Sequence, residues 1–161
     1  MKYLILVRHS IAENGSFSIT DFNRSLTNQG IQMSKIQAEK LLSSPFNPDI
    51  IVSSPAKRAM QTANVFLEIL NVEILKEFDF LYKDYSTTEF IDFLSHLPNN
   101  CSQVLLVGHN PSISAMSYHL TSGSGLSFAP ATMAVLKFNT DFWSEIEMGS
   151  GVLEKVYVQR I

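Results

Sequence analysis

Three short apolar segments of this chain each end close to an arginine or a histidine. The segments span residues 4–7, 50–52 and 104–107, and the side chains that follow them are Arg8, His9, Arg58 and His109. Because ligands of open α/β sheets bind outside the carboxyl ends of the strands, these four side chains are expected to converge. Guanidinium and imidazole groups donate hydrogen bonds to phosphate oxygens, so the pattern predicts a site for a phosphoryl group.

The roles of the four side chains follow from charge and nucleophilicity. Several cationic groups gathered at one sheet edge repel one another, and that arrangement lowers stability unless function requires it. A phosphoryl group brings about two negative charges at neutral pH, and fixed donors stabilise the charge that develops during its transfer. A neutral imidazole can attack phosphorus. We therefore predict that His9 is the nucleophile and that Arg8, Arg58 and His109 hold the phosphoryl oxygens.

Each of these residues, taken alone, also has a structural interpretation. A histidine after a strand can be a nucleophile, an acid or base, a metal ligand or a structural group, although the neighbouring Arg8 disfavours a divalent cation. Arg58 lies beside Lys57 and can be a solvated surface residue. His109 can be a loop residue bonded to backbone. The functional interpretation rests on the conjunction of the four.

The apolar pattern predicts strands that alternate with helices. Strands are expected at about residues 2–8, 49–53, 72–75, 103–107, 132–138 and 152–158. Helices are expected at about residues 28–43, 55–70, 87–97 and 111–120. Thr27, Ser54 and Asn110 are the predicted N-caps, the last two before a proline at the first helical position. The Gly- and Ser-rich stretch 122–130 is expected to rim the site.

Composition limits the class of protein. A chain of 161 residues that is 45% hydrophobic predicts one domain over residues 1–161. The net charge of −3 and the lack of a basic stripe argue against nucleic acid as a partner. Cys101 is the single cysteine, which excludes an internal disulfide and favours a reducing compartment. Without a secretory signal or an apolar run of about 20 residues, the expected location is cytoplasmic, with no membrane partner.

Several segments resemble the histidine phosphatase superfamily, whose best-known members are phosphoglycerate mutases. These segments are Leu6–Ser10, Ser53–Ala63 and Leu106–Pro111. The chain is more closely similar to the SixA-like phosphohistidine phosphatases. That similarity rests on Asp21–Gly30, the Leu81–Tyr82 pair and Trp143, and it extends over essentially the whole chain.

The resemblance implies a fold and a chemistry. The implied fold is an α/β, three-layer α/β/α sandwich that has a mostly parallel sheet with one antiparallel strand and no large cap insertion. The implied intermediate is a phosphohistidine on His9, in a phosphate pocket of Arg8, Arg58 and His109, and neither a metal nor a cofactor takes part. An uncapped site would suit a phosphorylated protein, although a small phosphorylated metabolite also fits.

Two positions depart from the family pattern. Ser10 stands where relatives carry glycine or alanine, and its hydroxyl could donate to phosphate. Relatives often carry an acidic proton donor directly before the leucine that matches Leu81, but this chain has Phe80 there. Asp79 and Glu77 are the candidate replacements.

The missing acid bears on the substrate. An alkoxide leaving group that lacks a placed acid loses roughly 10²–10⁴-fold in rate, whereas an imidazole, with a pKa near 6.5, leaves more easily. We therefore expect a phosphatase that prefers phosphohistidine to ordinary phosphomonoesters. The alternatives are a small-molecule phosphatase or mutase, and a non-catalytic phosphate-binding regulatory module. Oligomeric state is not predicted.

Overall fold

A computed structural model describes residues 1–124 and 126–159. The strands are β1 (Lys2–Arg8), β2 (Ile50–Ser53), β3 (Leu75–Glu77), β4 (Gln103–Gly108), β5 (Met133–Phe138) and β6 (Gly151–Tyr157). The α-helices are α1 (Asn28–Leu42), α2 (Lys57–Leu70), α3 (Thr87–Ser95) and α4 (Ser112–Leu120). Short 3-10 helices are η1 (Asp21–Asn23), η2 (Asp79–Tyr82) and η3 (Trp143–Glu145).

The strands form one sheet in the order β3-β2-β4-β1-β5-β6. Neighbours are parallel from β3 through β1, whereas β5 runs antiparallel to both β1 and β6. The central strands β1, β2 and β4 are almost continuously apolar, which is typical of strands covered on both faces. The predicted sheet, mostly parallel with one antiparallel strand, is confirmed.

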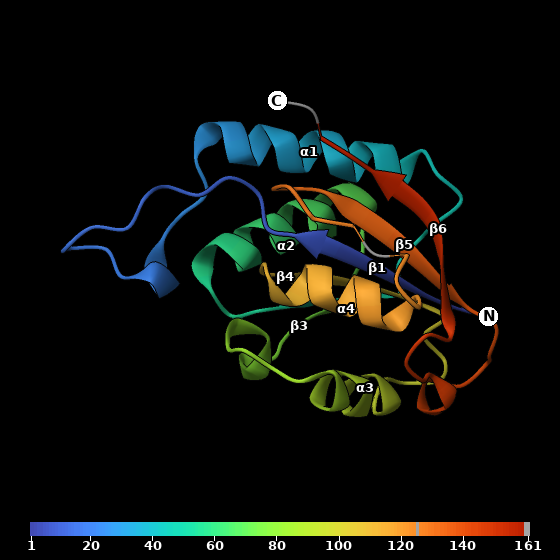
Figure 1. Cartoon of the computed structure of the whole chain (residues 1–161). Coiled ribbons are helices and arrows are strands. Elements are labelled where there is room, and N and C mark those ends of the chain that lie inside the picture. Colours follow the sequence, from blue (N-terminus) through green and yellow to red (C-terminus); the bar gives the residue numbers. More distant parts are fainter. Residues whose placement is uncertain (125, 160–161) are drawn as a thin grey trace.

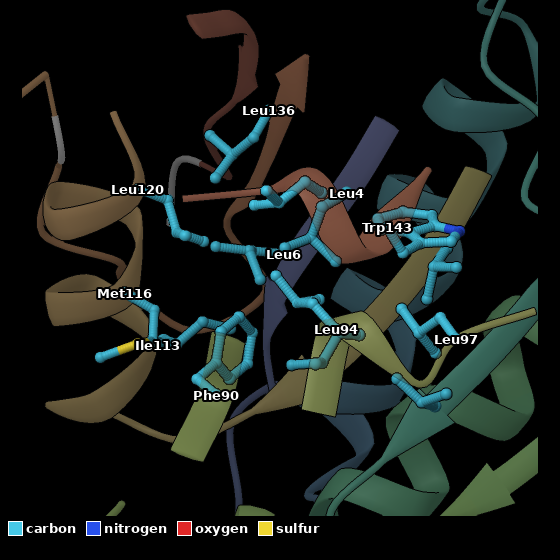
Figure 2. Close-up of a cluster of buried hydrophobic side chains, with 14 of the residues drawn as sticks. Leu4, Leu6, Phe90, Leu94, Leu97, Ile113, Met116, Leu120, Leu136 and Trp143 are labelled. Carbon is cyan, nitrogen blue, oxygen red and sulfur yellow. The ribbon is translucent and has the colours of Figure 1, made fainter. Parts of the chain in front are cut away.

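Alternate side chains of the strands enter two separate apolar layers, because successive residues of a strand point to opposite faces. Leu4 and Leu6 of β1 pack with α3, α4 and Trp143, as Figure 2 shows. Ile5 and Val7 pack with α1 and α2 on the other face. Figure 1 shows the helices on both sides of the sheet, so the predicted three-layer sandwich is also confirmed.

Several predicted boundaries were wrong. The third strand occupies Leu75–Glu77 rather than 72–75, because pairing with β2 begins only at Leu75, which is in register with Ile51. The third helix ends at Ser95, two residues before its predicted end, with His96 as its C-cap.

Both proline-led helix starts also lie later than predicted. Helix α2 begins at Lys57, and Ser54 does not cap it: the Ser54 hydroxyl accepts from the Ala56 N–H at 3.2 Å, outside the helix, and its other contact is with His109. Helix α4 begins at Ser112 without a side-chain cap, after a cis Asn110–Pro111 peptide. Thr27 does cap α1, accepting from Gly30 N at 3.0 Å as predicted.

The connection from β1 to α1, residues 9–27, extends from the body of the molecule (Figure 1). Its base is fixed by a bridge between Ala12 and Leu26, and by the Leu26 N–H, which donates to Gln61 Oε1 at 2.7 Å. This loop carries η1, and with it Asp21, toward the start of α2. Within the described ranges, no helix has the length and apolar character needed to cross a bilayer.

Candidate active site

The carboxyl ends of three neighbouring parallel strands place the predicted residues side by side. Arg8 of β1 is in register with Gly108 of β4, and the His9 N–H donates to the Gly108 carbonyl at 3.0 Å. On the other side of β4, the Ser54 N–H donates to the Val107 carbonyl at 3.1 Å. The turns that follow β1, β2 and β4 therefore meet at one edge of the sheet.

The hydrogen bonds of His9 fix which nitrogen of its ring carries the proton. Nδ1 lies 2.8 Å from the Ser10 carbonyl oxygen, which can only accept, so Nδ1 carries the proton. Nε2 therefore keeps its lone pair, and Arg58 Nε–H donates to it at 3.3 Å. Burial lowers the pKa of His9 to about 3, with further lowering by His109 and the two arginines against the raising effect of the Ser10 carbonyl. At neutral pH the ring is therefore uncharged.

His109 lies beside His9, with 5.0 Å between the ring centroids. Its Nε2 is 2.8 Å from the Ser54 hydroxyl, and its Nδ1 is buried without a hydrogen-bond partner among the described residues. Burial lowers the pKa of His109 to about 4. Both imidazoles are therefore neutral, and the fixed positive charge of the cluster comes from Arg8 and Arg58.

Arg8 is held by the chain that leads into β5. Its Nη1 donates to the Phe128 carbonyl at 2.8 Å, and Asn110 Nδ2 donates to the same oxygen at 2.8 Å. Arg8 Nε is buried without a partner in the described part of the chain. The 122–130 stretch thus reaches the site through Phe128, while residue 125 of that stretch lies outside the described residues.

Arg58 is the second residue of α2, rather than the fourth as predicted, and its side chain is only 7% exposed. Besides the bond to His9, its Nη1 donates to the Asp21 carbonyl at 2.7 Å and its Nη2 to Asp21 Oδ2 at 3.1 Å. Arg58 therefore connects His9 to the loop between β1 and α1. The start of α2 adds positive potential at the same place.

Three other predicted residues make no described side-chain hydrogen bond to this group. Ser10 is fully buried, its N–H donates to Thr62 Oγ1 at 3.1 Å, and its hydroxyl has no partner among the described residues. Glu77 ends β3 and Asp79 opens η2, and both side chains are exposed. Neither carboxylate forms a described hydrogen bond with His9, His109 or the arginines.

Sequence reasoning missed three residues that touch the cluster. Ser54 contacts His109 instead of capping a helix. Asp21 accepts from Arg58, and Tyr82 packs its ring edge-on to His109 at 5.7 Å between centroids. Asp21 and Tyr82 both fall in segments that carried the family resemblance, but only their neighbours in space reveal a role.

The arrangement supplies the parts that transfer of a phosphoryl group needs. His9 Nε2 is unprotonated and accepts from Arg58, and the guanidinium groups of Arg58 and Arg8 can hold oxygens. The described residues hold no group of three or more His, Cys, Asp or Glu side chains placed to bind a metal ion.

Comparisons with known proteins agree with this geometry. Residues 4–89 match the family described as the histidine phosphatase superfamily (branch 1). No curated protein matches the chain. Among solved structures, a protein named as the phosphohistidine phosphatase SixA from Nakamurella multipartitia is 25% identical to this chain. The two structures superpose with a TM-score of 0.83 over 98% of this chain and 95% of that one.

Two further solved structures share the fold. The protein named as SixA from Agrobacterium tumefaciens is 23% identical, with a TM-score of 0.82 over 98% of each chain. A protein histidine phosphatase SixA complexed with tungstate is 21% identical, with a TM-score of 0.83 over 96% of this chain and 95% of that one.

Proposed function

Because the chain belongs to the histidine phosphatase superfamily, we propose that it is a phosphatase that carries the phosphoryl group on His9 and transfers it to water without a metal ion. The single observation that carries the proposal is the state of the His9 ring. Nδ1 is committed to the Ser10 carbonyl, so the lone pair of Nε2 is directed to the side where Arg58 donates. Membership of the family and the SixA-like neighbours support phosphatase activity.

The proposed reaction has two steps. In the first, His9 Nε2 forms a bond to phosphorus while the bond between phosphorus and the leaving group breaks, and its electron pair goes to the leaving group. In the second, a water oxygen attacks phosphorus, the P–Nε2 bond breaks, its electron pair returns to Nε2, and a proton from the water passes to solvent. Arg8, Arg58 and His109 hold the phosphoryl oxygens in both steps.

The proposed substrate is a phosphohistidine, most simply one on a protein. Asp21 is the carboxylate bonded to the cluster, and the hydroxyl of Tyr82, with Arg24 and Arg58, lowers its pKa to about 2, so it carries no proton to donate. Glu77 and Asp79 are exposed and form no described hydrogen bond with the cluster. An imidazole leaving group whose second nitrogen is protonated departs neutral and needs no acid, whereas an alkoxide does need one.

Labelling tests the nucleophile. The protein is incubated with radiolabelled phosphoramidate and quenched in alkali, and the labelled residue is located by peptide mapping. We expect acid-labile label on His9, absent from His9→Ala and retained in His96→Ala, a matched change at the exposed C-cap of α3. Label on another residue, or turnover by His9→Ala, would overturn the assignment. A folded wild-type protein that binds phosphate but takes up no label would be a binding module.

A substrate panel tests the leaving-group argument. Phosphohistidine protein, a phosphoserine peptide, a sugar phosphate and p-nitrophenyl phosphate are compared by kcat/KM. We expect phosphohistidine to exceed the phosphoserine and sugar esters by at least 10²-fold, the lower end of the effect of a general acid. Equal rates on the alkyl esters would contradict the preference and favour a small-molecule phosphatase.

We also propose the cytoplasmic location that the lone Cys101 favours, because a buried free thiol is kept reduced there. Immunoblots of separated cell fractions test it, and recovery outside the cytoplasmic fraction would contradict it.

A further inference from the structure

Asp21 sits at a junction that the four predicted site residues do not explain. Its carboxylate accepts from Arg24 Nη1 at 3.0 Å through Oδ1, and from Arg58 Nη2 at 3.1 Å and the Tyr82 hydroxyl at 2.7 Å through Oδ2. Its backbone carbonyl accepts from Arg58 Nη1 at 2.7 Å. Asp21, in η1, thus connects Arg24 of the β1–α1 loop with Arg58 at the start of α2 and Tyr82 at the end of η2.

We propose that Asp21 is a positioning residue that orients the guanidinium of Arg58 toward His9 and couples Tyr82 to it. The proposal rests on the proposed function, since it assigns a role in the same reaction. Asp21 contacts neither imidazole by a described hydrogen bond, so it acts through Arg58 and Tyr82.

The burial of Arg58 explains why the contact matters. The Arg58 side chain is 7% exposed, whereas that of Asp21 is 55% exposed. An exposed ion pair contributes little, but a buried guanidinium that loses its partner keeps its desolvation cost. Asp21 accepts one hydrogen bond from each terminal nitrogen, which holds Nε toward His9 Nε2 and leaves one N–H on each terminal nitrogen for phosphoryl oxygens. Without those acceptors the guanidinium is free to rotate away from that direction.

Tyr82 transmits the same constraint to the second imidazole. Its hydroxyl is bonded to Asp21, its ring lies edge-on to His109 at 5.7 Å between centroids, and Phe22 lies edge-on to Tyr82 at 5.1 Å. The hydroxyl proton is engaged by the carboxylate, and the pKa of Tyr82 is raised by that bond. Tyr82 therefore fixes the position of the Asp21 carboxylate and does not donate a proton to the substrate.

A double-mutant cycle tests the coupling. Asp21→Ala, Tyr82→Phe and the double variant are assayed for kcat and KM on phosphohistidine protein, with Asp84→Asn and Tyr118→Phe as matched exposed controls. We expect Asp21→Ala to lower kcat at least tenfold while KM changes less than threefold. The reason is that a misaligned Arg58 would stabilise the phosphoryl group less in the transition state, whereas binding of the substrate in the ground state would change little. Tyr82→Phe is expected to lower kcat about threefold, and to have no further effect when Asp21 is already alanine.

The outcomes separate this proposal from the proposed function. A folded Asp21→Ala with kcat within twofold of the wild type, or a Tyr82→Phe effect that is the same in both backgrounds, overturns the positioning role while leaving the His9 assignment intact. If Asp21→Ala does not fold, Asp21→Asn takes its place, because it removes the charge and replaces one of the two acceptor oxygens by an NH2 donor, so that Arg24 and Arg58 can no longer both be accepted. The same twofold limit on kcat then applies. An unlabelled His9 in the wild type overturns the proposed function itself.

Discussion

His9 and His109 show how burial next to cations sets the charge of a side chain. Each ring is removed from water beside two guanidinium groups, and desolvation is the largest cause of its lowered pKa. The neutral form of an imidazole is the one that can attack phosphorus, so under the proposed function the surroundings that disfavour imidazolium keep His9 in its reactive form. The negative charge of Asp21 partly opposes the arginines at His109 by raising its pKa.

The histidine pKa values predict the pH dependence of the site. Because the values are lowered to about 3 for His9 and about 4 for His109, both rings should stay neutral as the pH falls from 8 to 5. The test is an NMR titration of the ring Cε1–H signals, assigned by their loss in His9→Gln and His109→Gln. A midpoint near 6.5 for either ring would contradict the prediction.

The residues proposed to hold the phosphoryl oxygens should act mainly on the chemical step. Removing one preorganised donor to a transition-state oxyanion costs about 10²–10³-fold in kcat. We expect losses of this size for Arg8→Ala, Arg58→Ala and His109→Ala in steady-state assays on phosphohistidine protein. A change confined to KM would show that the residue only binds the ground state. Lys57→Ala, beside Arg58 but exposed, is the matched control.

At the scale of elements, the site depends on how closely the β1–α1 loop packs on α1. Gly30, in the first turn of α1, leaves no room for a side chain, since a Cβ there would lie 2.1 Å from the Ile11 carbonyl oxygen. That approach fixes the loop that carries Asp21 over Arg58. The glycine is therefore required by space rather than by backbone conformation.

Substitution at Gly30 tests that packing. Gly30→Ala should lower the free energy of unfolding by about 1–3 kcal/mol, because the helix and the loop must move apart. Gly15→Ala is the control, since the nearest atom to a Cβ at that position is 3.7 Å away. Urea denaturation of both variants measures the difference, and equal stabilities would show that the loop yields without cost.

At the scale of the whole molecule, the sheet is held between two apolar layers that share its central strands. Phe66 of α2 lies in one layer and Phe90 of α3 in the other, and both are fully buried. Figure 2 shows Phe90 among the side chains of β1, α3 and α4. The strand ends that carry the site are therefore fixed from both faces.

Truncation on either face should be costly. Phe66→Ala and Phe90→Ala are each expected to lower the free energy of unfolding by about 3–5 kcal/mol, since both leave a cavity. Phe17→Ala, at a side chain fully exposed on the β1–α1 loop, should change it by less than about 0.5 kcal/mol. Chemical denaturation decides, and a small effect for either buried phenylalanine would mean that its layer collapses to fill the space.

The alternation of strands with helices could be predicted from the sequence. Strands covered on both faces are continuously apolar, and helices covered on one face repeat their apolar residues at helical spacing. The parallel arrangement of β1, β2 and β4 could then be inferred. With it came the convergence of Arg8, His9, Arg58 and His109, because the carboxyl ends of parallel strands lie at the same end of a sheet. The α2 start was misplaced because the Ser54 hydroxyl has a partner 55 residues away, which no local capping rule reveals.

The sequence by itself determined which side chains stand at the strand ends, since that depends only on the order of residues along each strand. Only the tertiary structure decided that His9 presents Nε2, that Ser10 is buried and that Asp21 holds Arg58. These features depend on contacts between residues far apart in the chain. The exposure of the candidate acids Glu77 and Asp79 was likewise visible only in the folded chain.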